Sequence, residues 1–316
     1  MHRGKVTRAV LALVLGVSIM TIGTSSASAV AIGRYRTAPA LKPPTVVDLG
    51  LPVTVPARTT MLINSYLVVG LAGELTAVSS VVYCRPPGSS TIAERLVTGQ
   101  NVATGTKVTL LTRGLVTAPA GNALNCRSYA LFINHTSTCV YGTVSVLPGT
   151  RLQVLPRIPS SAQLWQPGQV LVNASYSTPS VRFTAPTGAS SIQSFGDVNV
   201  TVCYGNDSDE LCARSGSRRS RTFAYVGTQF SVRQLNANGT VCRSFVNHPL
   251  AGTVLTEEIH HLKINQSIVN IPITGSCTSR TFIAAVRVTA NRGANSIVVE
   301  ANHQSGTGTY VRSVAN

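Results

Sequence analysis

Residues Glu257-Glu258-Ile259-His260-His261 form the densest cluster of titratable side chains in the sequence. In a strand, alternate residues share a face, so Glu258 and His260 would lie on one face and Glu257 and His261 on the other, and either pair could bind a metal ion or act as an acid and a base. Two ligands are too few for a stable metal site, and no third is indicated nearby. We therefore favour a solvent-exposed strand edge, and we expect neither a metal ion nor another cofactor.

A basic cluster follows the cysteine at position 212. Arg218, Arg219 and Arg221 are its main members, and guanidinium groups so close together could bind phosphate or sulfate. A solvent-exposed or protease-sensitive loop tip is the simpler interpretation. A rigid loop here could also serve as the bait of an inhibitor of secreted hydrolases. We keep the three arginines as candidate ligand-binding residues.

Trp165 is the only tryptophan, and it precedes Pro167-Gly168. An exposed tryptophan could stack on a sugar, whereas a buried one would belong to the core, which is the commoner outcome. The stretch from Gly205 to Glu210 offers several oxygens close together but lacks the spacing of an EF-hand. Trp165 is therefore the one further candidate for ligand binding, and no calcium loop is expected.

Positive charge dominates the composition. The chain of 316 residues has 26 Lys and Arg against 10 Asp and Glu, which gives a formal net charge of +16. Such an excess favours anionic partners, and we expect an anionic cell-wall polymer, an acidic glycan or a secreted protein. Nucleic acid is disfavoured, because the arginines are scattered and no aromatic residues are interleaved with them. The 22 arginines against four lysines are associated with GC-rich bacterial genomes.

Residues 1–29 have the features of a secretory signal peptide. A basic start at Arg3, Lys5 and Arg8 leads into an apolar run, and Ala27-Ser28-Ala29 suits a signal peptidase. The apolar run is about 14 residues long, shorter than the roughly 20 that a membrane-spanning helix needs. This favours cleavage over an uncleaved anchor. We predict an extracellular protein without stable membrane insertion after cleavage.

Two stretches of the sequence resemble each other. In the first stretch, Val81-Val82-Tyr83-Cys84 is followed by Cys126-Arg127-Ser128-Tyr129. In the second, Val200-Thr201-Val202-Cys203 is followed at a similar distance by Cys242-Arg243-Ser244-Phe245. An Asn-His pair comes after each stretch. The Asn-His pairs could be duplicated binding positions, but turns whose side chains bond the backbone explain them as well. The pattern predicts an internal duplication with domain-sized units.

Seven cysteines follow the signal, and in an exported protein they favour disulfides over metal binding. The repeat predicts bonds Cys84–Cys126 and Cys203–Cys242, and Cys212–Cys277 is the preferred third pair, which leaves the fate of Cys139 open. By strand alternation, Cys203 also faces the opposite side from Val198, Val200 and Val202. Its strand must therefore be buried on both faces or carry a bulge.

Alternating Val and Thr residues between glycine-containing turns predict β-strands throughout, with no helix outside the signal. We expect an all-β protein of two tandem antiparallel β-sandwich domains, Ig-like in architecture, related by internal duplication and stabilised by disulfides. The predicted parts are a flexible segment at 30–44, a first unit at 45–156 and a second unit at 160–316.

These features favour a secreted, non-catalytic protein with a binding or structural role at the cell surface or in the medium. An inhibitor of a secreted hydrolase and a hydrolase with an unrecognised site are the alternatives. Ten carboxylates leave few candidates for an acid/base pair, although two would suffice.

Overall fold

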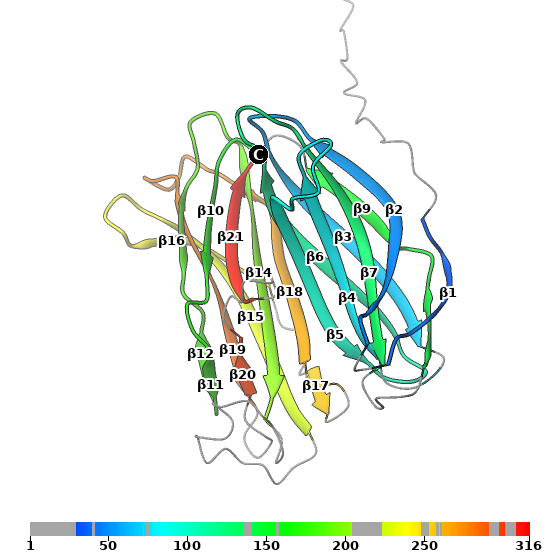
Figure 1. Cartoon of the computed structure of the whole chain (residues 1–316). Coiled ribbons are helices and arrows are strands. Elements are labelled where there is room, and N and C mark those ends of the chain that lie inside the picture. Colours follow the sequence, from blue (N-terminus) through cyan, green and yellow to red (C-terminus); the bar gives the residue numbers. More distant parts are fainter. Residues whose placement is uncertain are drawn as a thin grey trace, which may run out of the picture.

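The computed structural model describes residues 30–39, 42–71, 73, 76–134, 141–155, 158–203, 223–247, 253–256, 259, 261–290, 297–300 and 308–316. Over these residues the chain forms 21 β-strands, and it has no helix that could cross a membrane (Figure 1). Every ladder between these strands is antiparallel.

The first half of the chain forms two facing sheets. Sheet A has the order β1-β8-β3-β6, with β9 also paired to β3, and sheet B has the order β2-β7-β4-β5. The strands of sheet A are β1 (Gly33–Arg36), β3 (Thr60–Leu71), β6 (Lys107–Thr117), β8 (Thr143–Val146) and β9 (Arg151–Leu155). Those of sheet B are β2 (Thr45–Val55), β4 (Thr76–Arg85), β5 (Glu94–Val102) and β7 (Leu124–Asn134).

The second half forms another pair. Sheet C has the order β10-β21-β14-β20-β11, with β18 paired to β14, and sheet D has the order β12-β19-β15-β16, with β13 paired to β19 and β17 to β15. The strands of sheet C are β10 (Ser161–Trp165), β11 (Val170–Val172), β14 (Ser191–Val202), β18 (His261–Pro272), β20 (Ile297–Val299) and β21 (Tyr310–Ala315). Those of sheet D are β12 (Ser175–Ser177), β13 (Val181–Thr184), β15 (Phe223–Leu235), β16 (Val241–Asn247), β17 (Thr253–Thr256) and β19 (Thr281–Ala290).

The alternation of the sequence explains these strands. Along β7, Cys126, Ala130 and Phe132 are buried, whereas Asn125 and Arg127 on either side of Cys126 are exposed. A strand with this pattern covers a core with one face and leaves the other in solvent. Sheets A and B enclose one such core, and sheets C and D enclose another.

The two halves share one pattern of strand pairing. In sheet A, β3 pairs with β6, β8 and β9, and in sheet C, β14 pairs with β18, β20 and β21. In sheet B, β4 pairs with β5 and β7, just as β15 pairs with β16 and β19 in sheet D. The protein is thus all-β, with two tandem antiparallel β-sandwiches related by internal duplication and stabilised by disulfides. We call them unit 1 and unit 2.

The cysteine-containing repeat of the sequence, however, does not align equivalent strands of the two units. Cys84 lies on β4, whose counterpart in unit 2 is β15, whereas Cys203 directly follows β14, the counterpart of β3. Cys126 lies on β7, which corresponds to β19, whereas Cys242 lies on β16. The duplication is real, but the cysteines of the two units are not equivalent.

The disulfides differ accordingly from the prediction. The bond Cys84–Cys126 is present and ties β4 to β7 across 42 residues, a loop for which the chain-entropy model gives about 4 kcal/mol. The predicted pair Cys203–Cys242 is wrong, because Cys242 bonds to Cys277, and the pair Cys212–Cys277 is wrong for the same reason. Cys203 is itself disulfide-bonded, and its partner lies outside the described residues. Cys139 and Cys212 both lie outside the described residues.

Geometry explains the error. Cys203 lies near the end of β15 where Phe223 pairs with β17, and Cys242 lies at the other end, where Leu235 pairs with β16. β15 has 13 residues, so the two cysteines are separated by roughly 40 Å of strand. The turn between β18 and β19, in contrast, brings Cys277 to the same end of the sandwich as Cys242.

The parity of Cys203 is resolved by burial on both faces of β14. One face packs in the core against sheet D. On the other face, Phe195 packs against unit 1, and Cys203 packs with Leu171 and Val298 of sheet C. There Phe195 and Val314 of sheet C pack with Leu62 of sheet A in a small apolar cluster between the units.

The position of β1 and the extent of the strands can be set beside the predicted parts of the chain. β1 lies within the 30–44 segment that we expected to be flexible, and it pairs along its length with β8. The limits 45–156 and 160–316 of the two units stay a prediction. The strands of the two units occupy 33–155 and 161–315.

Candidate functional site

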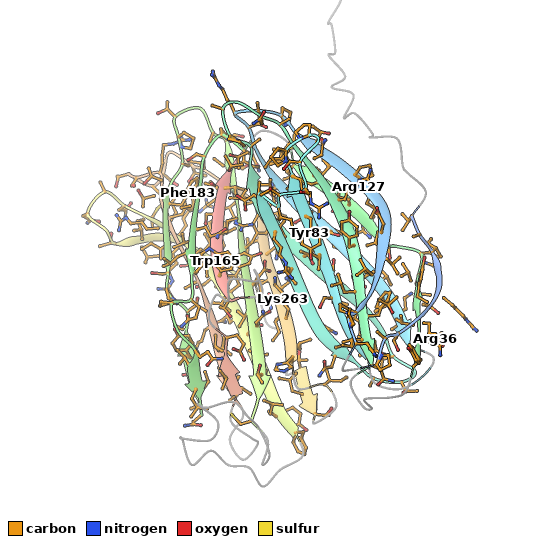
Figure 2. The ribbon with its side chains drawn as sticks, viewed as in Figure 1. Arg36, Tyr83, Arg127, Trp165, Phe183 and Lys263 are labelled. Carbon is orange, nitrogen blue, oxygen red and sulfur yellow. A yellow bond between two sulfur atoms is a disulfide. The ribbon has the colours of Figure 1, made fainter. Side chains whose placement is uncertain are left out.

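The outer face of sheet B carries a hollow of about 290 Å³, which we call the sheet B hollow. Two tyrosines, Tyr83 on β4 and Tyr129 on β7, lie in it with their ring centres 5.6 Å apart. Figure 2 shows Tyr83 and Arg127 on this unit. The hollow therefore has an aromatic surface of the kind that packs against flat apolar groups.

Arginines surround these rings. The guanidinium carbons of Arg85 and Arg95 lie 5.8 and 5.6 Å from the centre of the Tyr83 ring, within cation–π range. Arg127, opposite Tyr83 on β7, is exposed and lies 3.2 Å from the Asp48 carboxylate. Three cations and two aromatic rings thus converge on one exposed sheet face.

One donor in the hollow is unsatisfied. The Nε of Arg85 is buried and has no hydrogen-bond partner in the described part of the chain. A buried N–H without a partner costs free energy comparable to a lost hydrogen bond, and since this atom is enclosed, a ligand in the hollow would have to meet the other guanidinium nitrogens of Arg85.

Local structure explains how these side chains reach the surface. Cys84 and Cys126 point inward and form the disulfide, so Tyr83, Arg85 and Arg127 beside them point outward. A turn follows at once, in which the Ser89 N–H donates to the carbonyl of Pro86 and Gly88 adopts a positive φ of 73°. Pro86, Gly88 and Ser89 form the rim of the hollow.

Little negative charge opposes these arginines. The Asp48 carboxylate bonds Arg127 and also accepts a hydrogen bond from the Gly50 N–H at 2.9 Å. Glu94 pairs with Cys84 and so shares the inward side of the sheet, where partial burial raises its pKa. The charge of the hollow is therefore positive, and the arrangement suits an anion that also offers an apolar surface.

A second charged cluster lies in the boundary between the units. It consists of Arg113 on β6, Asp197 on β14, Lys263 on β18, and Tyr310 and Arg312 on β21, and we call it the inter-unit cluster. Figure 2 shows Lys263 where the two units meet. All five residues are buried, with exposed fractions of 7% or less.

Hydrogen bonds across the boundary hold this cluster. Arg113 donates to Asp197 through two nitrogens, at 2.5 and 3.3 Å, and the Tyr310 hydroxyl donates to the Arg113 carbonyl at 2.7 Å. The Lys263 Nζ donates to the Thr98 hydroxyl of sheet B at 3.0 Å. These bonds join unit 1 to unit 2.

The pKa values of the cluster follow from burial and charge. Burial alone would raise the pKa of Asp197, but the charges of Arg113 and Lys263 and the hydrogen bond from Arg113 lower it to about 2. Burial lowers the pKa of Lys263 to about 8, although Asp197 partly opposes this shift, and burial likewise raises the pKa of Tyr310. Since the cluster is enclosed, we interpret it as a structural joint.

A chain of hydrogen bonds reaches the surface at one end of sheet C. The Thr201 hydroxyl donates to Glu300 at 2.5 Å and lies 2.7 Å from the Nδ1 of His261. Glu300 also accepts a bond of 2.6 Å from Gln169. Thr201 is 2% exposed and its proton is directed to Glu300, so the chain fixes strand ends and does not present a free nucleophile.

The structure places the predicted residues as follows. Trp165 is half-buried on β10 and packs edge-on against Tyr310, with ring centres 4.8 Å apart. Arg218, Arg219, Arg221, Glu258 and His260 lie outside the described residues, as does the stretch from Gly205 to Glu210. Among the described residues, no group of three potential metal ligands occurs.

Comparison with known proteins adds little. No protein-family model matches the chain, and no curated protein matches it. Among solved structures, it is similar to that of infectious bursal disease virus, Gt strain (10% identity, 90% of this chain and 77% of the other, TM-score 0.28). It is also similar to the tandem CBM22-1-CBM22-2 domains of Paenibacillus barcinonensis Xyn10C (11% identity, 91% of each chain, TM-score 0.25). Scores this low carry no argument about function.

The bond Cys84–Cys126 is a signal in the sequence for the sheet B hollow. If Cys84 and Cys126 bond in the core, strand alternation requires that Tyr83, Arg85 and Arg127 face solvent together. The inter-unit cluster had no comparable signal, because nothing in a single strand shows that another unit covers its outer face.

Proposed function

We propose that this protein is a secreted, non-catalytic binding protein for an anionic surface polymer, either an acidic glycan or a phosphate-bearing wall polymer, and that the sheet B hollow holds it. The disulfides support an oxidising, extracellular location, as does the predicted signal peptide.

One observation carries this proposal: three arginines and two tyrosines share an exposed sheet face. Guanidinium groups bind carboxylate, phosphate and sulfate through paired hydrogen bonds, and tyrosine rings pack against apolar surfaces such as the faces of sugars. The residues that line the hollow include no carboxylate, which supports binding over acid/base chemistry.

Calorimetric titration with defined polymers tests the proposal. Polygalacturonate supplies carboxylates on sugar rings, poly(glycerol phosphate) supplies phosphates without rings, and neutral dextran is the uncharged control. We expect binding to one or both anionic polymers at low salt, a marked loss at high salt and none to dextran.

A matched pair of variants locates the site. Arg85→Gln with Arg127→Gln removes two charges from the hollow and should weaken binding at the sheet B hollow by at least about tenfold, since each lost charge-assisted bond is worth about 1.5 kcal/mol or more. Arg34→Gln with Arg36→Gln removes the same charge from β1 on sheet A, and we expect less than a twofold effect. Equal losses in both variants would show that binding depends on net charge alone and would reject the site.

A further inference from the structure

A second hollow, of about 620 Å³, lies on the outer face of sheet D, and we call it the sheet D hollow. It is polar and basic, and its lining includes Ser175, Ser177, Gln229, Ser231, Arg233 and Arg287. Its volume is within the range of ordinary ligand pockets.

Strand register explains why these side chains gather. Gln229 lies opposite Arg287, and Ser177 of β12 also lies opposite Arg287, so the three share one face of the sheet. Ser231 and Arg233 come next on the face of β15 that carries Gln229, because alternate residues of a strand share a face. The opposite face of β15, with Phe230 and Val232, fills the core of unit 2.

Arg233 and Arg287 are the cations of this hollow. In the described part of the chain, neither Arg233 nor Arg287 forms a hydrogen bond or an ion pair with another side chain. Each guanidinium can therefore offer all its donors to a ligand, and the serine hydroxyls and the Gln229 amide beside them can add hydrogen bonds to an oxygen-rich anion.

The duplication places the two hollows in corresponding positions. The sheet B hollow lies over β4 and β7, and the sheet D hollow lies over β15 and β19, their counterparts. Arg85 and Arg233 are the last outward-facing residues of β4 and β15, so the corresponding strands end in corresponding cations.

The two hollows lie on separate units. Leu62 of sheet A packs with Phe195 and Val314 of sheet C, and Lys263 of sheet C donates a hydrogen bond to Thr98 of sheet B, so sheets A and B of unit 1 both contact sheet C. No described residue lines both hollows.

From these observations we infer that the sheet D hollow is a second binding site for the same class of carboxylate- or phosphate-bearing polymer, and that the protein bridges two polymer chains. This inference rests on the proposed function. The two sites lie on different units and share no lining residue, so two polymer chains can bind at once.

Stoichiometry tests the second site. A trimer of galacturonate or of glycerol phosphate occupies a single site, so the wild-type protein should bind two such oligomers. Arg233→Gln with Arg287→Gln should reduce the number to one, with less than a twofold change in the remaining dissociation constant. Arg85→Gln with Arg127→Gln should also leave one. Gln229→Glu, which places a carboxylate opposite Arg287, should abolish the same site as the sheet D double variant without removing any arginine.

Light scattering with the long polymer tests bridging. The wild-type protein should cross-link polygalacturonate or poly(glycerol phosphate) and increase the scattering, whereas each double variant should bind the polymer without this increase. A wild-type stoichiometry of one, or cross-linking that persists in the sheet D variants, would overturn the inference. If the wild-type protein binds one oligomer and Arg85→Gln with Arg127→Gln binds none, the proposed function stands and the second site is rejected. If the wild-type protein binds no oligomer, the proposed function and the second site are both rejected.

Discussion

Arginine occupies two opposite environments in this protein. In the inter-unit cluster, Arg113 is buried and its charge meets the Asp197 carboxylate. On the outer face of sheet D, Arg233 is exposed and no carboxylate of the described residues pairs with it. A buried cation needs its partner within the fold, because desolvation is otherwise too costly, whereas an exposed one can remain available to an external anion. The position of the few carboxylates therefore separates arginines that hold the structure from arginines that can bind.

The largest expected effect concerns the buried partner. Asp197→Asn keeps the shape of the side chain but leaves Arg113 and Lys263 buried without a counter-charge, so we expect a loss of about 3–5 kcal/mol in the free energy of unfolding. Denaturant unfolding measures this loss. The matched variant Asp48→Asn, at the exposed pair with Arg127, should change stability by less than about 1 kcal/mol. Similar effects of both variants would contradict the distinction between the two environments.

The second prediction concerns pH. The pKa of Lys263 is about 8 in the folded protein, against roughly 10.4 in an unfolded chain, so the unfolded state binds more protons between these values. Stability should therefore increase from pH 8 to pH 10, by roughly 2–3 kcal/mol at most. Above pH 10 it should fall again, because the pKa of buried Tyr310 is raised and the unfolded tyrosine ionises first. Lys263→Met should remove the increase between pH 8 and 10, and an unchanged pH profile in this variant would show that Lys263 is not its source.

A third, smaller effect separates ring contacts from charge in the sheet B hollow. Tyr129→Leu keeps an apolar side chain but removes the aromatic ring, so affinity for polygalacturonate should fall by about 3- to 10-fold, whereas affinity for poly(glycerol phosphate), which has no rings, should not change. Titration with both polymers measures the difference. An equal loss for the two would indicate that Tyr129 acts through the shape of the hollow.

The smallest expected effect reverses the usual direction of a mutation. Asp48→Asn releases Arg127 from its exposed ion pair, worth about 0.5 kcal/mol, and should strengthen polymer binding by about twofold. Asparagine can still accept the hydrogen bond from the Gly50 N–H, so the local turn should remain. Weaker binding in this variant would mean that Asp48 positions Arg127 for the ligand.

The sequence predicted the fold class well, because alternation in segments such as Val198 to Val202 follows directly from strand geometry. It also predicted Cys84–Cys126, which joins directly paired residues of neighbouring strands. It failed for Cys242, since sequence spacing does not show at which end of the long strand β15 a cysteine lies. Burial of β14 on both faces was one of the two expected explanations for the parity of Cys203, but nothing in the sequence showed that Phe195 and Asp197 on one of these faces contact unit 1.

The position of β21 has a consequence for how the chain acquires its structure. This strand lies between β10 and β14 in sheet C, and its Ser313 bonds Ser194, 119 residues earlier. Until residues 310–315 have been synthesised, β10 and the 192–197 part of β14 lack their partner in sheet C, and Tyr310 and Arg312 cannot complete the joint with unit 1. Such distant pairing slows folding. Unit 1 can form early, whereas sheet C and the docking of the two units must be late events.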